Sequence, residues 1–353
     1  MKVAFIKQHW DVFGPWSSVP WQDWETLFKF WPGKASLWEA TCLLKADWYV
    51  IPQQTSNWYI QEVIKHRLKP LTEKYVTNIT KTDELPLHQY DIVITLDPIL
   101  PHLVVPPGVV FAYFCNENSD PNYIASLRKP FGKYDLFLAH ALDAPNDFDH
   151  LPAAVSFPYP RHPKLVRKLF AKHKEERVWV EWRTLTTLAR AELYGPKAEG
   201  VLSDLQKKLK CKTVCYSKVN KSPYSITDPP AFGDAKTYLQ QLGACKYYIA
   251  VGRKGGAGQG IVDAASAGCL CIGDKTRPYH RIICYPDMLC GDIEEAIQKF
   301  RKLREDSRLQ KKVRTWQDIK LFDEFVKRPL RLLKKAVRPV SYTHLTLPTT
   351  PYV

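Results

Sequence analysis

Four glycines lie close together in the second half of the chain, at positions 255, 256, 258 and 260. The apolar stretch Tyr247–Val251 precedes them, and a short helical pattern, Gly260–Ala267, follows. Glycines let a backbone approach a ligand closely, and the N-terminus of the following helix favours an anion. Arg253 and Lys254 add positive charge on the approach. A strand, a glycine-rich turn and a helix in this order are suited to binding a diphosphate.

Three interpretations of the glycine-rich turn compete. A P-loop requires G-x-x-x-x-G-K-[ST], which this sequence lacks. A dinucleotide-binding turn requires G-x-G-x-x-G, and the spacing of Gly256, Gly258 and Gly260 fits it poorly. A tight turn without a ligand would also satisfy the glycines. The glycines alone therefore leave the last two interpretations open.

Short apolar runs alternate with helical patterns along almost the whole chain, which predicts βα units and parallel sheets. The predicted strands are Val3–Ile6, Trp48–Ile51, Asp91–Leu96, Val109–Phe114, Asp135–Ala139, Ala154–Phe157, Val178–Trp182, Thr213–Tyr216, Tyr247–Val251 and Cys269–Ile272. The predicted helices are Trp58–Leu68, Ala235–Leu242, Gly260–Ala267, Ile293–Leu303, Leu309–Val326 and one that starts at Ser36, where Glu39 completes a capping box.

The proline-rich segment Pro158–Pro163 interrupts this alternation, so we place a domain junction there. We predict an N-terminal domain over 1–160, a C-terminal domain over 161–306 and a basic C-terminal helix over 307–339. The fold class is α/β, with two doubly wound, Rossmann-like domains that face a central cleft, where ligands bind at the carboxyl ends of the strands. Val340–Thr350 resembles a translated sequencing adapter, so we expect 340–353 to be an artefactual tail and the natural C-terminus to be missing.

The stretch from Tyr247 to Gly273 resembles the C-terminal signature of glycosyltransferases with the B-type fold (GT-B, family 4-like), in which a glycine-rich loop precedes a helix of the form acid-A-x-A-x-G and a strand. The matching residues are Gly258, Gly260, Asp263, Ala264, Gly268 and Ile272. The resemblance implies that the backbone N–H groups of Gly258, Gln259 and Gly260 bind the diphosphate of a nucleotide-sugar donor. It also implies that Asp263 binds the donor ribose, and that the last helix packs back on the first domain.

One position departs from the family pattern. Retaining members carry two acids eight positions apart, and Gly255 occupies the place of the first. This departure favours an alternative, a non-catalytic nucleotide-sugar or glycan-binding protein. A third hypothesis, an NAD-dependent oxidoreductase, needs an acid after the next strand, and Asp274 is available there.

Further candidates follow other predicted strands. Arg183, after Val178–Trp182, and Lys254 are candidate diphosphate ligands, since a guanidinium suits phosphate recognition. Eight of the eleven tryptophans lie within the first 58 residues, and the predicted loop Lys7–Pro20 is a candidate acceptor site. A general base must reach the acceptor hydroxyl; the eligible residues that we single out are Asp11, Glu117 and His140.

Composition narrows the class of protein. The chain has 353 residues and a formal net charge of +15, of which 299–338 contribute +10 through 15 basic and 5 acidic residues. Because the charge is confined to one helical segment, we expect no nucleic-acid partner. A basic amphipathic helix can instead lie on an anionic membrane surface, which would suit a lipid-linked acceptor. No apolar run approaches the roughly 18 residues of a membrane span, and the N-terminal one is too short for a secretory signal.

These observations predict a cytoplasmic glycosyltransferase, with peripheral contact to the inner membrane face as an open alternative. Its partners would be a nucleotide-sugar donor and a glycan or lipid-linked acceptor. B-type members generally do not depend on a bound metal, so the resemblance implies no metal requirement, and we expect no other cofactor. The nine cysteines lack a C-x-x-C pair, which argues against a disulfide framework or a zinc site.

Overall fold

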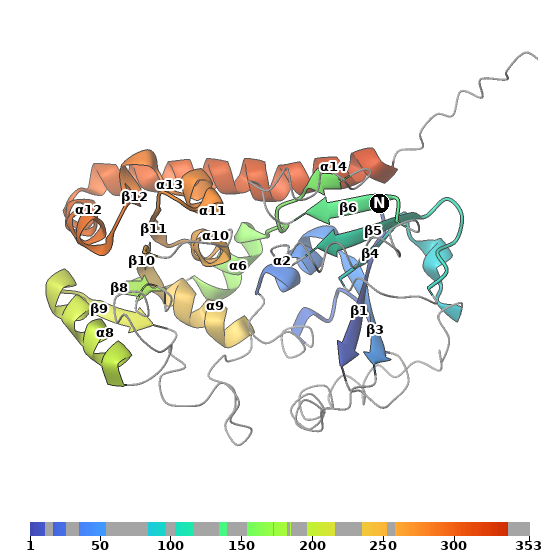
Figure 1. Cartoon of the computed structure of the whole chain (residues 1–353), viewed down its shortest axis with the longest axis horizontal. Coiled ribbons are helices and arrows are strands. Elements are labelled where there is room, and N and C mark those ends of the chain that lie inside the picture. The colour runs from blue at the N-terminus through green and yellow to red at the C-terminus, as the bar shows by residue number, and fades with distance from the viewer. Residues whose placement is uncertain are drawn as a thin grey trace, which may run out of the picture.

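A computed structural model describes most of the chain (Figure 1). The described residues are 1–10, 17–25, 35–53, 84–96, 103–115, 134–139, 154–171, 173–181, 184, 196–215, 235–252 and 258–337. The predicted helix Trp58–Leu68 and the adapter-like tail lie outside them.

The first sheet has seven strands in the order β2-β3-β1-β4-β5-β6-β7, and all neighbours are parallel except β2 and β3. Its strands are β1 (Val3–Trp10), β2 (Ser17–Val19), β3 (Ala46–Gln53), β4 (Ile92–Thr95), β5 (Val110–Cys115), β6 (Leu136–Ala139) and β7 (Ala154–Ser156). The interior strand β4 is buried along its whole length, which explains its continuous apolar sequence.

The second sheet has five parallel strands in the order β12-β11-β10-β8-β9. Its strands are β8 (Glu175–Val180), β9 (Lys212–Cys215), β10 (Cys245–Ala250), β11 (Leu270–Asp274) and β12 (Leu289–Cys290). The described helices are α2 (Ala35–Leu44), α6 (Pro163–Phe170), α8 (Pro196–Leu209), α9 (Ala235–Ala244), α10 (Gln259–Ser266), α11 (Pro278–Ile283), α12 (Ile293–Glu305), α13 (Ser307–Phe322) and α14 (Arg328–Val337). The 3₁₀ turns η2 (Leu87–Gln89) and η4 (Pro286–Met288) and the π-helical turn η5 (Asp323–Lys327) complete the elements.

The structure confirms all ten predicted strands, with ends shifted by a few residues. One end changes an interpretation: β1 continues to Trp10 in register with β3, so Lys7–Trp10 belongs to the sheet and not to a loop. The helix from Ser36 is also present, but the proposed capping partner Glu39 has another role, since its carboxylate binds Arg161, His162 and Ser266.

The C-terminal helices α13 and α14 form a nearly continuous rod along one side of the molecule, from the second sheet to the first (Figure 1). The helix that we predicted over Leu309–Val326 continues through η5 and α14 to Val337, within the basic C-terminal helix that we predicted over 307–339. Pro329 has no N–H to donate to the carbonyl of Phe325 four residues earlier. That carbonyl instead accepts the N–H of Arg161 at 2.8 Å, which ties the rod to the segment between the two sheets.

The two sheet units share an apolar contact region. Trp38 of α2 is fully buried, and its ring lies edge-on to Phe170 of α6, with 6.0 Å between ring centroids. α2 and α6 also contact α9 beside the second sheet. The contact places the first unit against the helices that surround α10. Among the described residues, no helix combines the length and the apolarity needed to cross a membrane.

Candidate functional site

The glycine-rich turn leads into α10 at the carboxyl edge of the second sheet. Gly258 is the N-cap of α10 and has a positive φ of +83°. A glycine has no side chain to cap the helix, so the first N–H groups of α10 receive no side-chain hydrogen bond from this position. An uncapped helix N-terminus carries partial positive charge and free donors. The local backbone is therefore prepared for an anion.

Two glycines at the start of α10, Gly258 and Gly260, have no room for a side chain. A Cβ built on Gly258 would lie 2.6 Å from Cδ2 and 2.7 Å from Nε2 of His280. A Cβ on Gly260 would lie 2.5 Å from the hydroxyl of Tyr248. Real Cβ atoms essentially never approach other atoms this closely. The close packing explains why the pattern contains glycine where most helices begin with Ser, Thr, Asp or Asn.

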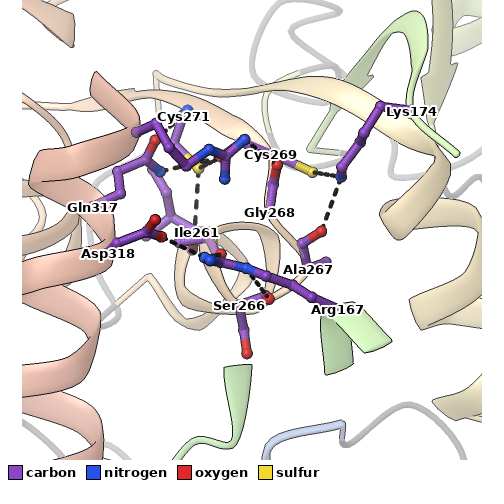
Figure 2. A network of polar contacts seen from close by, with 12 residues as sticks. Arg167, Lys174, Ile261, Ser266, Ala267, Gly268, Cys269, Cys271, Gln317 and Asp318 are labelled. Carbon is purple, nitrogen blue, oxygen red and sulfur yellow. Dashed lines mark hydrogen bonds and ion pairs between the residues drawn. The ribbon is translucent and has the colours of Figure 1, made fainter. Parts of the chain in front are cut away.

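The other end of α10 is held by cations. Arg167 of α6 donates to the carbonyls of Ala265 and Ser266 at 2.9 and 3.2 Å, and Lys174 donates to the carbonyl of Ala267 at 2.9 Å (Figure 2). Arg314 of α13 donates to the carbonyl of Gly268. Cations at the C-terminus of a helix interact favourably with its dipole. These cations bind the carbonyls at the C-terminus of α10, where the helix dipole is negative. The N-terminus, where the dipole is positive, has no side-chain cap.

Asp263, the predicted ribose ligand, lies in the middle of α10 within a buried polar cluster. Its Oδ1 binds Nη1 of Arg161, and its Oδ2 accepts the hydroxyl of Tyr238 at 3.1 Å. Arg161 also donates to Oε1 of Gln259 at 2.7 Å and to Oε1 of Glu39 at 3.0 Å. One fully buried guanidinium therefore bridges Glu39 of the first sheet unit and two residues of α10.

Burial and the positive charge of Arg161 shift the pKa values of the side chains in this cluster. Burial raises the pKa of Glu39, and Arg161 offsets only part of the effect. Burial alone would lower the pKa of Arg161, but Asp263 and Glu39 outweigh it and raise that pKa. Burial and the carboxylate of Asp263 raise the pKa of Tyr238, so its hydroxyl stays protonated and donates. The cluster holds the position of Asp263 firmly.

The structure brings four predicted donor ligands together, Gly258, Gln259, Gly260 and Asp263, on the first turns of α10. The other predicted site residues, Asp11, Glu117, His140, Arg183 and Lys254, lie outside the described residues. Glu181 and Thr184, on either side of 182–183, are described. Glu181 donates its N–H to the carbonyl of Ile249 at 2.9 Å, and Thr184 accepts the N–H of Val251 at 3.1 Å. These bonds hold Glu181 and Thr184 beside the end of β10.

Asp274, the acid that the oxidoreductase hypothesis requires, is buried at the end of β11. Its Oδ2 accepts the N–H of Gly252 at 3.0 Å, and its Oδ1 accepts the N–H and the hydroxyl of Thr276 at 2.8 and 2.6 Å. Burial raises the pKa of Asp274, but these hydrogen bonds outweigh it, so the pKa is lowered. The carboxylate already accepts three hydrogen bonds, from Gly252 and Thr276, and has little remaining capacity to accept hydrogen bonds from a ribose. This argues against the oxidoreductase hypothesis.

Sequence reasoning missed three residues beside α10. Arg161 lies between two prolines that we interpreted only as a break in the pattern. Arg277 pairs with Glu181 at 3.2 Å, and His280 packs against Gly258. A signal existed for Arg161, since an arginine in the proline-rich connection between two predicted domains calls for a partner where it is buried. His280 had no comparable signal, because its position depends on how α11 folds back.

No protein-family model and no curated protein matches the chain. Several solved structures are similar in fold. A trehalose-6-phosphate synthase, studied for glycosyl transfer with retention, matches over 94% of this chain and 93% of its own, with a TM-score of 0.51 and 9% identity. An apo structure of OtsA matches over 96% and 100%, with a TM-score of 0.50 and 8% identity. Anabaena HepE, in complex with UDP and glucose, matches over 95% and 99%, with a TM-score of 0.49 and 12% identity. The two sheets of this chain, one parallel and one parallel except for β2, and the first two of these similarities identify its fold as GT-B, with two Rossmann-like domains.

Proposed function

We propose that the protein is a glycosyltransferase that moves a sugar from a nucleotide-diphosphate-sugar donor to a hydroxyl of a glycan or other acceptor. The observation that carries this proposal is the uncapped start of α10, formed by Gly258, within a GT-B fold. The trehalose-6-phosphate synthase with a similar fold is described as an enzyme of glycosyl transfer with retention, which supports the same class of reaction here.

The donor diphosphate would bind at the N–H groups of the turn Gly258–Gly260, with Arg183 and Lys254 as further cationic ligands. Leaving-group charge develops on the diphosphate as the glycosidic bond breaks, and preorganised donors stabilise that charge. Asp263 would bind the ribose hydroxyls. A carboxylate offers about four lone-pair sites, of which the described contacts with Arg161 and Tyr238 use two, so acceptor capacity remains.

The acceptor hydroxyl must lose a proton during transfer, and Asp11, Glu117 and His140 are the residues that we propose for this step. We further propose the division into an acceptor-side domain, 1–160, a nucleotide-sugar domain, 161–306, and the C-terminal helix, 307–339. The position of Arg161 between Glu39 and Asp263 supports a donor site close to the junction of the first two.

A membrane-bound acceptor is supported by the surface of η5 and α14. A cavity of about 950 Å³ is lined by residues of these two elements, and Lys327, Arg331, Lys334 and Lys335 on them are exposed. Clustered lysine and arginine attract anionic lipid headgroups. We therefore propose a cytoplasmic enzyme whose C-terminal helix contacts the inner membrane face when the acceptor is lipid-linked.

We propose transfer without a bound metal and without another cofactor. The described residues contain no group of three or more His, Cys, Asp and Glu side chains placed to hold a metal ion. The sequence also contains Asp147-Phe148-Asp149, a spacing that can bind a divalent cation, outside the described residues. An assay with EDTA and with added Mg²⁺ or Mn²⁺ therefore decides this point, and loss of activity in EDTA contradicts metal independence.

The experiment that tests the function has two arms. A thermal-shift screen with UDP, GDP, ADP and NADH identifies the nucleotide, since a ligand that binds only the native state raises the melting temperature. The matching nucleotide sugars are then assayed for release of the nucleoside diphosphate, with Asp263→Ala as the control variant. Stabilisation by NADH alone would overturn the proposal.

A second candidate is a non-catalytic nucleotide-sugar or glycan-binding protein, which the glycine at 255 favours because the family's first acid is missing there. Stabilisation by a nucleoside diphosphate, without turnover across a panel of sugar acceptors and lipid-linked acceptors, is the result expected for that protein. Turnover that exceeds the Asp263→Ala background excludes it.

A further inference from the structure

His280 is a fully buried histidine of α11 that lies against Gly258, where the glycine-rich turn ends and α10 begins. Its ring lies between two glycines, since a Cβ on Gly258 would lie 2.7 Å from Nε2 and a Cβ on Gly273 would lie 2.8 Å from Nδ1. The missing side chains on both sides make room for the imidazole. Nε2 points toward Gly258, the N-cap of α10.

The hydrogen bonds of the ring fix its tautomer. The N–H of Asp274 donates to Nδ1 at 2.8 Å, so Nδ1 carries a lone pair and the proton of the neutral ring is on Nε2. Burial and the positive charge of Arg277 lower the pKa of His280 to about 3, so the ring is neutral at physiological pH. Nε2 is therefore a hydrogen-bond donor.

This donor has no hydrogen-bond partner in the described structure. A buried polar group without a partner costs roughly 1–3 kcal/mol and calls for an explanation. The nearby ion pair of Arg277 and Glu181 does not supply a hydrogen-bond partner for Nε2, because the Glu181 carboxylate binds Arg277 instead. The uncapped N-terminus of α10 lies against the same nitrogen, and two independent sources of donors, backbone and side chain, thus meet at one position.

We propose that the Nε2–H group of His280 donates a hydrogen bond to the diphosphate of the nucleotide donor at the N-terminus of α10. The inference rests on the proposed function and adds a specific diphosphate ligand to it. The Glu181 carboxylate lies near Gly260 and would repel an anion, but its pairing with Arg277 offsets that charge. A neutral donor with a fixed orientation adds binding without adding another buried charge.

Two substitutions separate the two nitrogens of the ring. Asparagine places an oxygen near the position of Nδ1 and keeps an acceptor for Asp274, but it removes the donor toward Gly258. Glutamine places an NH₂ group near the position of Nε2 and keeps that donor. We expect His280→Asn to weaken nucleoside diphosphate binding roughly 10- to 100-fold, as for a lost hydrogen bond to a charged group. We expect His280→Gln to retain most of the affinity.

Calorimetric titration measures the dissociation constants of UDP, GDP and ADP for the wild type, and the tightest ligand is used for the variants. Cys284→Ala is the matched control, because Cys284 also lies against Gly273 but is not the residue that faces the turn. Equal affinity of His280→Asn and the wild type overturns this inference and leaves the proposed function intact, as does an equal loss in both His280 variants. Failure of the wild type to bind any of the three diphosphates overturns both.

A measurement on the wild type covers the case in which His280→Asn does not fold. In protein labelled with [15N]histidine, the Nε2–H resonance of His280 is identified by its absence from the His280→Gln spectrum. Saturation with the diphosphate is expected to move this resonance, because a charged acceptor deshields the proton. A resonance that stays unchanged at saturation overturns the proposal.

Discussion

At the residue scale, Gly258 meets two separate requirements, a positive φ and the absence of a Cβ beside His280. Gly258→Ala should therefore cost more stability than backbone strain alone, which is about 1–2 kcal/mol. Gly108 is a matched control, since its φ is +85° and a Cβ there would meet nothing within 4 Å. Urea denaturation of both alanine variants checks this, and an equal loss at the two positions would contradict a packing role for His280.

The buried neutral state of His280 also has a consequence for acid stability. Its pKa is lowered from 6.5 to about 3 in the folded protein, so below pH 6.5 the unfolded chain binds a proton that the folded chain does not. The contribution of His280 to stability is complete above pH 6.5 and is lost as the pH falls toward 3, by up to about 1.4 kcal/mol per pH unit. Denaturation at pH 7.0, 5.5 and 4.5 should show this loss in the wild type and a shallower one in His280→Asn.

At the element scale, β11 depends on a side chain for part of its pairing. Within the described part of the chain, β12 pairs with Gly273 and Asp274 alone, so no described strand lies beside the first residues of β11 on that side. The buried amide of Gln317 from α13 takes this place: its Nε2 donates to the carbonyl of Cys269 at 3.3 Å, and its Oε1 accepts the N–H of Cys271 at 3.4 Å (Figure 2). A glutamine amide thus replaces a strand peptide group.

Gln317→Leu should cost about 1–3 kcal/mol of unfolding free energy, because two buried backbone groups lose their partners while the volume is kept. Thr315→Ala, at an exposed position of the same helix, should stay within about 0.5 kcal/mol of the wild type. The measurement is chemical denaturation of both variants. A Gln317→Leu protein as stable as the Thr315→Ala protein would show that β11 does not need this contact.

Element prediction succeeded where the signal was local and failed where it depended on contacts. Continuous apolar runs identified β4, β10 and β11, since interior parallel strands are buried on both faces. α6 was missed because we interpreted Pro163 as a break, whereas proline at N1 starts a helix. Glu39 met the spacing of a capping box, yet a buried arginine 122 residues away determines its role. No local pattern contains that information.

At the scale of the whole molecule, the two sheet units are linked through one buried cation. Arg161 lies between them in sequence, and its guanidinium binds Glu39 of the first unit and Asp263 of α10. Its N–H binds the carbonyl of Phe325 in the C-terminal rod. Three separate parts of the chain therefore depend on this residue. The sequence predicted the two units and Asp263, but their connection could be recognised only in the folded structure.

Arg161→Met should destabilise the protein by about 3–5 kcal/mol, because two carboxylates remain buried without their cation. Glu39→Gln in the same background should recover part of the loss, since it removes one of these charges. A double-mutant cycle by denaturation measures this coupling, which should exceed about 1 kcal/mol. Additive losses would mean that the guanidinium acts on each unit separately. The predicted non-additivity would instead make Arg161 the point at which the stability of the first sheet unit and the position of Asp263, the proposed ribose ligand, depend on each other.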